Sequence, residues 1–274
     1  MAKKPAPKKS AKTSVKATVK TTQSGIGSWN KWLALVFGVQ VIMILLFSAV
    51  QSYPVTINYL GLDSLQTNAQ GKTVLATGSQ SIFNLNLAYV IAASLLLAAI
   101  AYALLASRLL AFYQREIKNS INSVRWILYA VSTSIMVTAV ALVSGVQDIA
   151  SLYVILSSTA LMFVLAMFAE RHDQGGRTKW VLFWLSVVSG IIPWTIIKLN
   201  IIGGTIYGSV PAFVYWISIV ALVLFALVPL NLFLQLRKSG NWKNYLYADR
   251  MYVIASLVMY TVTAWLIYVA ILRP

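Results

Sequence analysis

Residues 82–106 read IFNLNLAYVIAASLLLAAIAYALLA, a stretch that contains no charged side chain. About 20 apolar residues are enough for a helix to cross the roughly 30 Å hydrocarbon core of a bilayer. Hydrophobic residues make up 59% of the chain's 274 residues, more than the roughly 45–50% typical of soluble domains. The stretch therefore predicts a membrane-spanning helix, and the composition predicts that most of the chain lies in a membrane.

Other runs of this kind lie before and after residues 82–106 and predict six further spans. The seven expected spans lie at about 32–53, 82–106, 122–146, 149–168, 180–200, 211–236 and 249–272. We therefore expect an all-α membrane protein in which residues 32–274 form one bundle of seven transmembrane helices.

Residues 1–31 carry lysines but no acidic residue, interspersed with Ala, Pro, Ser and Thr. Basic polar segments of this kind bury too little apolar surface to fold. We expect residues 1–31 to form a disordered basic tail that is attracted to anionic lipid head groups. The tail carries much of the net charge of +16. Since attraction to lipid head groups is a sufficient role for its lysines, nucleic acid is not an expected partner.

The positive charges also predict the orientation in the membrane. If the amino terminus is cytoplasmic, the opposite side carries only Lys72, Lys198 and Arg273 of the chain's 22 lysines and arginines. Short cytoplasmic loops retain an excess of these residues. We expect a multi-pass cell-membrane protein with a cytoplasmic amino terminus and an extracellular carboxyl terminus.

The connection between the first two spans, about residues 54–81, is the only long one. Within it Val55, Ile57 and Tyr59 alternate with polar neighbours. Apolar residues at every second position are typical of a half-buried strand. We expect a small β-hairpin on the outer face, with a disordered loop as the alternative.

The ionisable residues offer little chemistry within the membrane. His172 lies beside Glu170 and Asp173, but it is the only histidine and the chain has no cysteine, so a metal site with several convergent ligands is not expected. The six acidic residues fall in loops or at span ends, and Arg125 and Arg250 lie near span ends where long side chains can reach the interface. A carboxylate relay for proton pumping is therefore not expected. The sequence contains no P-loop, HExxH or GxSxG motif, and we expect no enzyme activity.

Hydroxyl and aromatic side chains supply most of the polarity inside the spans. Small hydroxyl residues usually serve helix packing in membranes, while aromatic residues deep within a span can line a pocket. The residues expected to line a pocket, if the bundle has one, are Ser132, Trp194, Trp216, Ser256, Tyr260 and Trp265.

Three stretches resemble heliorhodopsins, a family of seven-helix membrane proteins with an inside amino terminus. They are NSVRWILYAVSTSIM at Asn122–Met136, LQLRKSGNWKNYLY at Leu234–Tyr247 and SLVMYTVTAW at Ser256–Trp265. The expected orientation, which is the reverse of that in ordinary microbial rhodopsins, and the outer hairpin also fit. The resemblance covers all seven spans in order and leaves out the basic tail. It implies a rhodopsin-like bundle.

In heliorhodopsins the seventh span carries a Ser-x-x-x-Lys pattern whose lysine forms a Schiff base with retinal, and a counterion glutamate follows an Arg-Trp-x pattern in the third span. Aligned on Ser256, the lysine position of this chain is Tyr260. Aligned on Arg125–Trp126, the glutamate position is Leu128. A Schiff base needs an amine, which a phenol cannot supply, and without that cation a buried glutamate would be an uncompensated charge. We therefore expect no covalent retinal and no cofactor.

The resemblance, together with the missing lysine, implies a non-photochemical heliorhodopsin-like protein without covalent retinal. It is expected to act as a binding or regulatory and signalling module, as a homodimer and through a cytoplasmic protein partner. Two alternatives remain open. The first is a receptor or carrier for a noncovalent apolar ligand, such as a carotenoid, free retinal or a lipid. The second is a structural subunit of a membrane complex. Transport that uses backbone and hydroxyl groups alone is the least favoured reading.

Overall fold

A computed structural model describes residues 10–67, 73–173 and 177–274 of the chain. Within these ranges seven helical segments are long and apolar enough to cross a membrane, which confirms the expected seven-span, mostly helical fold. The first segment is Ser28–Phe47, the later part of α1 (Ser10–Phe47). The others are α2 (Leu87–Ala106), α4 (Ser123–Leu128) continued by the π-helix η1 (Tyr129–Thr133) and α5 (Ser134–Val143), α6 (Ile149–Arg171), α7 (Arg177–Tyr207), α8 (Ala212–Leu236), and α9 (Tyr245–Ile267) continued by the π-helix η3 (Tyr268–Leu272).

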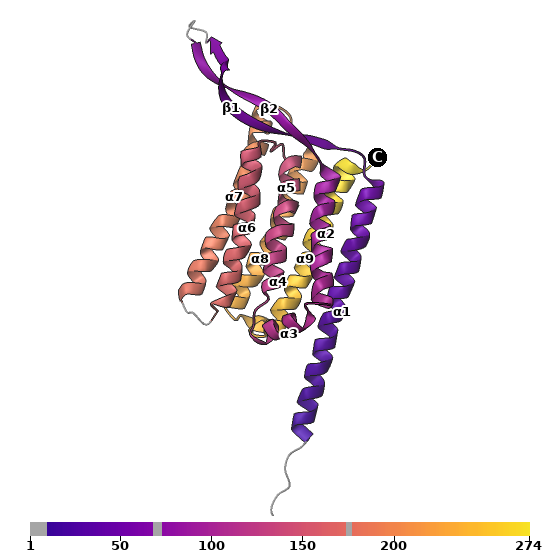
Figure 1. Cartoon of the computed structure of the whole chain (residues 1–274). Coiled ribbons are helices and arrows are strands. Elements are labelled where there is room, and N and C mark those ends of the chain that lie inside the picture. The colour runs from indigo at the N-terminus through magenta and orange to yellow at the C-terminus, as the bar shows by residue number, and fades with distance from the viewer. Residues whose placement is uncertain (1–9, 68–72, 174–176) are drawn as a thin grey trace, which may run out of the picture.

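The expected hairpin between the first two spans is also confirmed, whereas its place on the outer face stays a prediction. Strands β1 (Ser52–Thr67) and β2 (Thr73–Asn86) pair antiparallel, with Ser52 opposite Asn86. The hairpin crosses one end of the bundle (Figure 1) and is tied to it by a hydrogen bond from the Thr56 amide to the Gln147 carbonyl at 2.9 Å. We call this end the hairpin end. The opposite end carries the short helix α3 (Leu110–Lys118) and the 3₁₀ turn η2 (Gly240–Lys243), and we call it the α3 end.

The first helix differs from the expectation. Residues 10–31 belong to the predicted disordered tail, whereas the structure extends α1 back to Ser10. Adding turns to an existing helix avoids the cost of nucleating a new one, and the alanines and lysines of this stretch are good helix formers. Residues 1–9 of the predicted tail lie outside the described residues.

Polar side chains at the loop ends set where several helices begin. Asn86 accepts a hydrogen bond from the Ala88 amide at the start of α2, and Asp148 accepts one at 2.9 Å from the Ser151 amide at the start of α6. Such caps satisfy amides that have no partner within the helix. The Asp148 side chain therefore has a structural role at the hairpin end.

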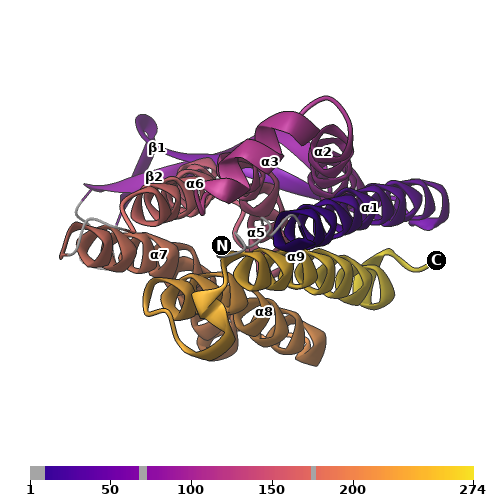
Figure 2. The ribbon, with the colours of Figure 1, turned by 90° about the horizontal axis from the view of Figure 1, so that it is seen from below.

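The third span, α4 to α5, forms the centre of the bundle (Figure 2), where α5 packs against α2, α6, α8 and α9. Its small and branched residues Ala139, Val140 and Leu142 are fully buried. Small side chains allow helices to approach closely where the surrounding lipid supplies no hydrophobic driving force. The residues that face the neighbouring spans from this segment are therefore the first place to look for a functional site.

Candidate functional site

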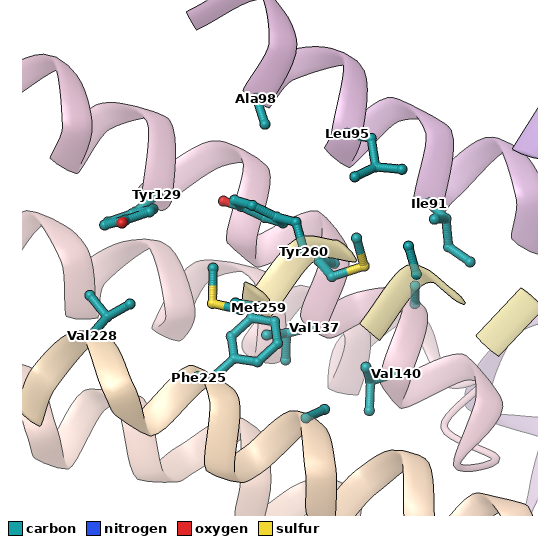
Figure 3. Close-up of a cluster of buried hydrophobic side chains, with 14 of the residues drawn as sticks. Ile91, Leu95, Ala98, Tyr129, Val137, Val140, Phe225, Val228, Met259 and Tyr260 are labelled. Atoms are coloured by element: carbon teal, nitrogen blue, oxygen red, sulfur yellow. The ribbon is translucent and has the colours of Figure 1, made fainter. Parts of the chain in front are cut away.

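Tyr260 occupies the expected lysine position and is fully buried. Its hydroxyl shares a 2.7 Å hydrogen bond with the Thr133 hydroxyl of η1, and its ring meets the Phe37 ring edge-on at 5.7 Å. Figure 3 shows the Tyr260 side chain among apolar side chains of α2, the third span and α8. The phenol therefore fills this part of the bundle, and its polar end has a partner.

A network of hydroxyl groups surrounds this position. Ser256 accepts a hydrogen bond from the Tyr102 hydroxyl at 2.7 Å and shares another with Tyr129 at 2.6 Å. Ser132 donates to the Ser94 carbonyl at 2.7 Å. The network joins α2, the third span and α9, and three of its members lie on the π-helical turn η1. π-helical turns change which side chains face a neighbouring helix and often occur at functional sites. The position of η1 therefore makes the region around Tyr260 a candidate functional site.

The residues expected to line a pocket are spread over different environments. Ser132, Ser256 and Tyr260 are buried together in the hydroxyl network. Trp216 is 66% exposed on α8. Trp265 stacks edge-on against Tyr268 at 5.1 Å. Trp194 lines a hollow that opens on the side of the bundle.

This lateral hollow has a volume of about 160 Å³ and lies between α6, α7 and α8, with Val137 of α5 at its inner wall. Its walls are almost entirely hydrocarbon and aromatic. The lining residues include Phe163 of α6, Gly190 and Trp194 of α7, and Leu222, Ala226 and Pro229 of α8. A Cβ atom on Gly190 would lie 2.5 Å from the Met162 sulfur, so the flexible Met162 side chain of α6 packs closely over this point of α7 and would have to move for a larger residue. The hollow suits an apolar ligand that enters from the bilayer.

A buried charged cluster lies at the α3 end of the bundle. The Arg125 guanidinium forms an ion pair with Glu170 at 2.6 Å and a second one with Asp249. Glu170 also accepts hydrogen bonds from the Trp126 indole at 2.6 Å and the Gln235 amide at 3.0 Å. Exposure of the three charged residues is 3% or less. Removing one partner of such a buried, hydrogen-bonded ion pair strongly destabilises the protein, because it leaves the other charge unpaired.

Two further groups complete the cluster around Asp249. The Asn122 amide donates to Asp249 at 3.1 Å, and the Tyr113 hydroxyl of α3 donates to it at 2.6 Å. Burial raises the pKa of Tyr113 above its ordinary value, and the negative charge of Asp249 raises this pKa further. The hydroxyl therefore remains a donor to the carboxylate over the physiological pH range.

The sequence reasoning missed this cluster. Arg125 was expected to reach the interface, but it is 2% exposed and its charge is neutralised inside the bundle. The acids Glu170 and Asp249 were interpreted as ordinary span-end residues. The sequence does contain one signal for the cluster: an arginine lies one turn inside a span, and acids lie at the same end of two other spans. Such residues can meet in a bundle. His172, by contrast, contacts the Phe168 carbonyl at 2.8 Å, and within the described ranges no group of metal-binding residues includes it.

Aromatic rings connect the lateral hollow with the charged cluster. Phe163 lines the hollow and packs against Tyr129 at 5.4 Å and Trp126 at 6.4 Å between ring centroids. Trp126 in turn donates to Glu170, and Arg125 lies 3.8 Å above the centre of the Tyr252 ring. We refer to Trp126, Tyr129, Phe163 and Tyr252 as the aromatic cluster. A displacement of Phe163 would therefore change its packing against Trp126, whose indole is hydrogen-bonded to Glu170.

The family model for heliorhodopsins matches residues 26–272. The chain belongs to the heliorhodopsin family. This confirms the resemblance that the three sequence stretches suggested. Among solved structures, the crystal structure of a light-driven proton pump from Leptosphaeria maculans is similar in fold, with a TM-score of 0.60 and 14% sequence identity over 91% of this chain and 95% of that chain. No curated protein sequence matches the chain.

The family corrects the expectation that this heliorhodopsin has no cofactor. Membership points to retinal as the cofactor. The expectation was wrong because it equated the cofactor with its covalent bond. A segment Tyr245–Leu272 without lysine offers no amine for that bond, whereas the lateral hollow offers apolar space for the molecule.

The residues at the lysine position do not fit a Schiff base. The segment Tyr245–Leu272 contains no lysine, and Tyr260 presents a phenol that is hydrogen-bonded to Thr133. Leu128, at the expected counterion position, is buried with 5% exposure and offers no charge. The lateral hollow does fit an apolar ring or polyene by the chemistry of its walls. The walls of the lateral hollow thus fit an apolar molecule by their chemistry, while Tyr260 offers no amine for covalent attachment.

Proposed function

We propose that this heliorhodopsin is a regulatory membrane module that holds an apolar ligand, with retinal as the first candidate, without a covalent bond in the lateral hollow. The observation that carries the proposal is the shared wall at Phe163, which belongs both to the hollow and to the aromatic cluster. Occupancy of the hollow would thereby influence the charged cluster at the α3 end. The proposed role requires no catalysed reaction, in keeping with the expectation from the sequence.

The second part of the proposal concerns the side on which the signal is read. The excess of lysine and arginine on the amino-terminal side favours a cytoplasmic α3 end. Arg125, Glu170 and Asp249 join α4, α6 and α9 there, so a shift of one helix must be accommodated by the other two. We infer that a cytoplasmic protein partner reads the arrangement of these helix ends, and that the protein works as a homodimer, as the family resemblance implies.

Retinal binding tests the first part of the proposal. All-trans retinal is titrated into the full-length protein in phosphatidylcholine nanodiscs, and tryptophan fluorescence is followed because Trp194 lines the hollow. We expect saturable quenching. After borohydride treatment the intact mass of the protein should be unchanged, since a noncovalent ligand leaves no reducible bond to it. An increase in mass by one reduced retinal, or no saturable quenching, would contradict the proposal.

A matched pair of variants locates the binding site. Ala226 lines the hollow from its exposed side, so Ala226→Trp should fill the hollow without disturbing the core. Val223 lies on the same helix and is 58% exposed, and Val223→Trp is the control. We expect quenching by retinal to be lost in A226W and kept in V223W. Equal binding by both variants would place the ligand elsewhere.

A further inference from the structure

The lateral hollow continues toward the hairpin end as a groove between α7 and α8. A second hollow of about 240 Å³ shares Trp194 and Leu222 with the first. From Gly190 to Lys198 the helix α7 rises by about 12 Å, at about 1.5 Å per residue. The two hollows together form an elongated groove, because residues of α7 and α8 line both of them along this length, with α5 and α6 contributing to the first hollow alone. This shape suits a single apolar chain better than a ligand with two chains.

A cationic side chain lies at the outer part of this groove. Lys198 of α7 lines the second hollow. Two polar neighbours in the wall already have partners, since the Ser218 hydroxyl contacts Ser144 at 3.1 Å and the Tyr215 hydroxyl contacts Thr205 at 2.5 Å. In the described part of the chain, no ion pair or hydrogen bond engages the Lys198 ammonium group. A lysine stem can lie along apolar surface while its charged end reaches the membrane interface.

We propose that the groove binds one apolar chain that ends in a carboxylate, with the chain along α7 and α8 and the carboxylate at Lys198. This inference rests on the proposed function and names the chemistry of its ligand. Charge complementarity favours the carboxylate, because a charge-assisted hydrogen bond is about twice as strong as a neutral one. Retinal, which has no carboxylate, would occupy the same groove more weakly.

Three retinoids that share one ring and polyene test the inference. Retinoic acid, retinal and retinol differ in the end group alone, and each is titrated into the nanodisc-embedded full-length protein under the quenching assay described above. We expect retinoic acid to bind about tenfold more tightly than retinol, the difference that one charge-assisted hydrogen bond supplies. Palmitate, a carboxylate with an unrelated apolar chain, should displace retinoic acid.

Variants of Lys198 identify the group responsible. Lys198→Met should abolish the preference for retinoic acid and leave retinol binding unchanged, whereas Lys198→Arg should retain the preference. Lys118 is an exposed lysine at the opposite end of the bundle, and Lys118→Met is the matched control that should behave as the wild type. A preference for the acid that persists in K198M would overturn the inference.

The outcomes separate this inference from the proposed function. If the three retinoids bind equally and palmitate does not compete, the hollow still holds a ligand but Lys198 does not select its end group. In that case the lysine only reaches toward lipid head groups, and the inference is wrong. If no retinoid quenches the fluorescence saturably, the proposed function itself fails.

Discussion

Among the single residues, Tyr113 links the short helix α3 to the charged cluster through one hydroxyl. Its hydrogen bond to Asp249 measures 2.6 Å. A hydrogen bond to a charged group contributes about 1.5–3 kcal/mol, so Tyr113→Phe should lower the thermal unfolding temperature at neutral pH. Tyr153 is 69% exposed on α6, and Tyr153→Phe, which removes an exposed hydroxyl, should leave the unfolding temperature unchanged.

The effect of Tyr113 should also depend on pH. Burial, together with the Asp249 charge, raises the pKa of Tyr113 in the folded protein, so the folded protein keeps this proton where an unfolded chain has lost it. The stabilisation is complete below the ordinary tyrosine pKa of about 10 and falls as the pH rises above that value. The difference in unfolding temperature between wild type and Y113F should therefore shrink above about pH 10. A difference that stays constant would contradict the assigned role.

The limits of sequence reasoning at this scale follow from the distances along the chain. Tyr260 and Leu128 could be singled out because a short motif places them. Arg125 pairs with Glu170 and Asp249, which lie 45 and 124 residues further along the chain. No local sequence pattern predicts such pairings. Burial of the three side chains depends on how α4, α6 and α9 pack, which hydropathy does not specify.

For the helices as elements, the charged cluster should hold α4, α6 and α9 together at the α3 end. Arg125→Met leaves two buried carboxylates without their cation and should destabilise the protein by about 3–5 kcal/mol. The triple variant R125M/E170Q/D249N removes all three charges and should recover most of that loss. Unfolding of the purified protein in mild detergent measures both.

The control for the cluster is Arg250→Met, because Arg250 is the exposed neighbour of Asp249. It should have a stability close to that of the wild type. If the triple variant is as unstable as R125M, the lost packing of Arg125 on Tyr252 rather than unpaired charge would explain the effect.

Element by element, hydropathy predicted the seven spans, and period-two alternation predicted the hairpin. Neither signal reveals the π-helical turn at Tyr129–Thr133, because a single inserted residue scarcely changes the composition of a span. The turn nevertheless places Tyr129 and Thr133 against Ser256 and Tyr260. The extension of α1 to Ser10 likewise follows from helix propagation, which the charge pattern of the tail does not show.

For the whole molecule, the fold is shared between sequences that have few residues in common. At 14% identity the bundle still superposes on a light-driven proton pump with a TM-score of 0.60, because spans of the right length and small residues at contacts are enough to specify the bundle. Function depends on particular sites within such a fold. In this chain the proposed sites are the lateral hollow and the buried charged cluster, neither of which hydropathy alone predicts.

Orientation in the membrane is also a property of the whole molecule, and the chain offers a direct test because it has no cysteine. Ser79 is exposed on β2 at the hairpin end, and Ser239 is exposed beside η2 at the α3 end. In intact cells, a membrane-impermeant maleimide should label S79C, and it should label S239C only after permeabilisation. The reverse pattern would place Arg125, Glu170 and Asp249 near the outer surface. The proposal that a cytoplasmic protein partner reads the helix ends at the α3 end would then fail. Binding in the lateral hollow does not depend on the direction of insertion and would stand.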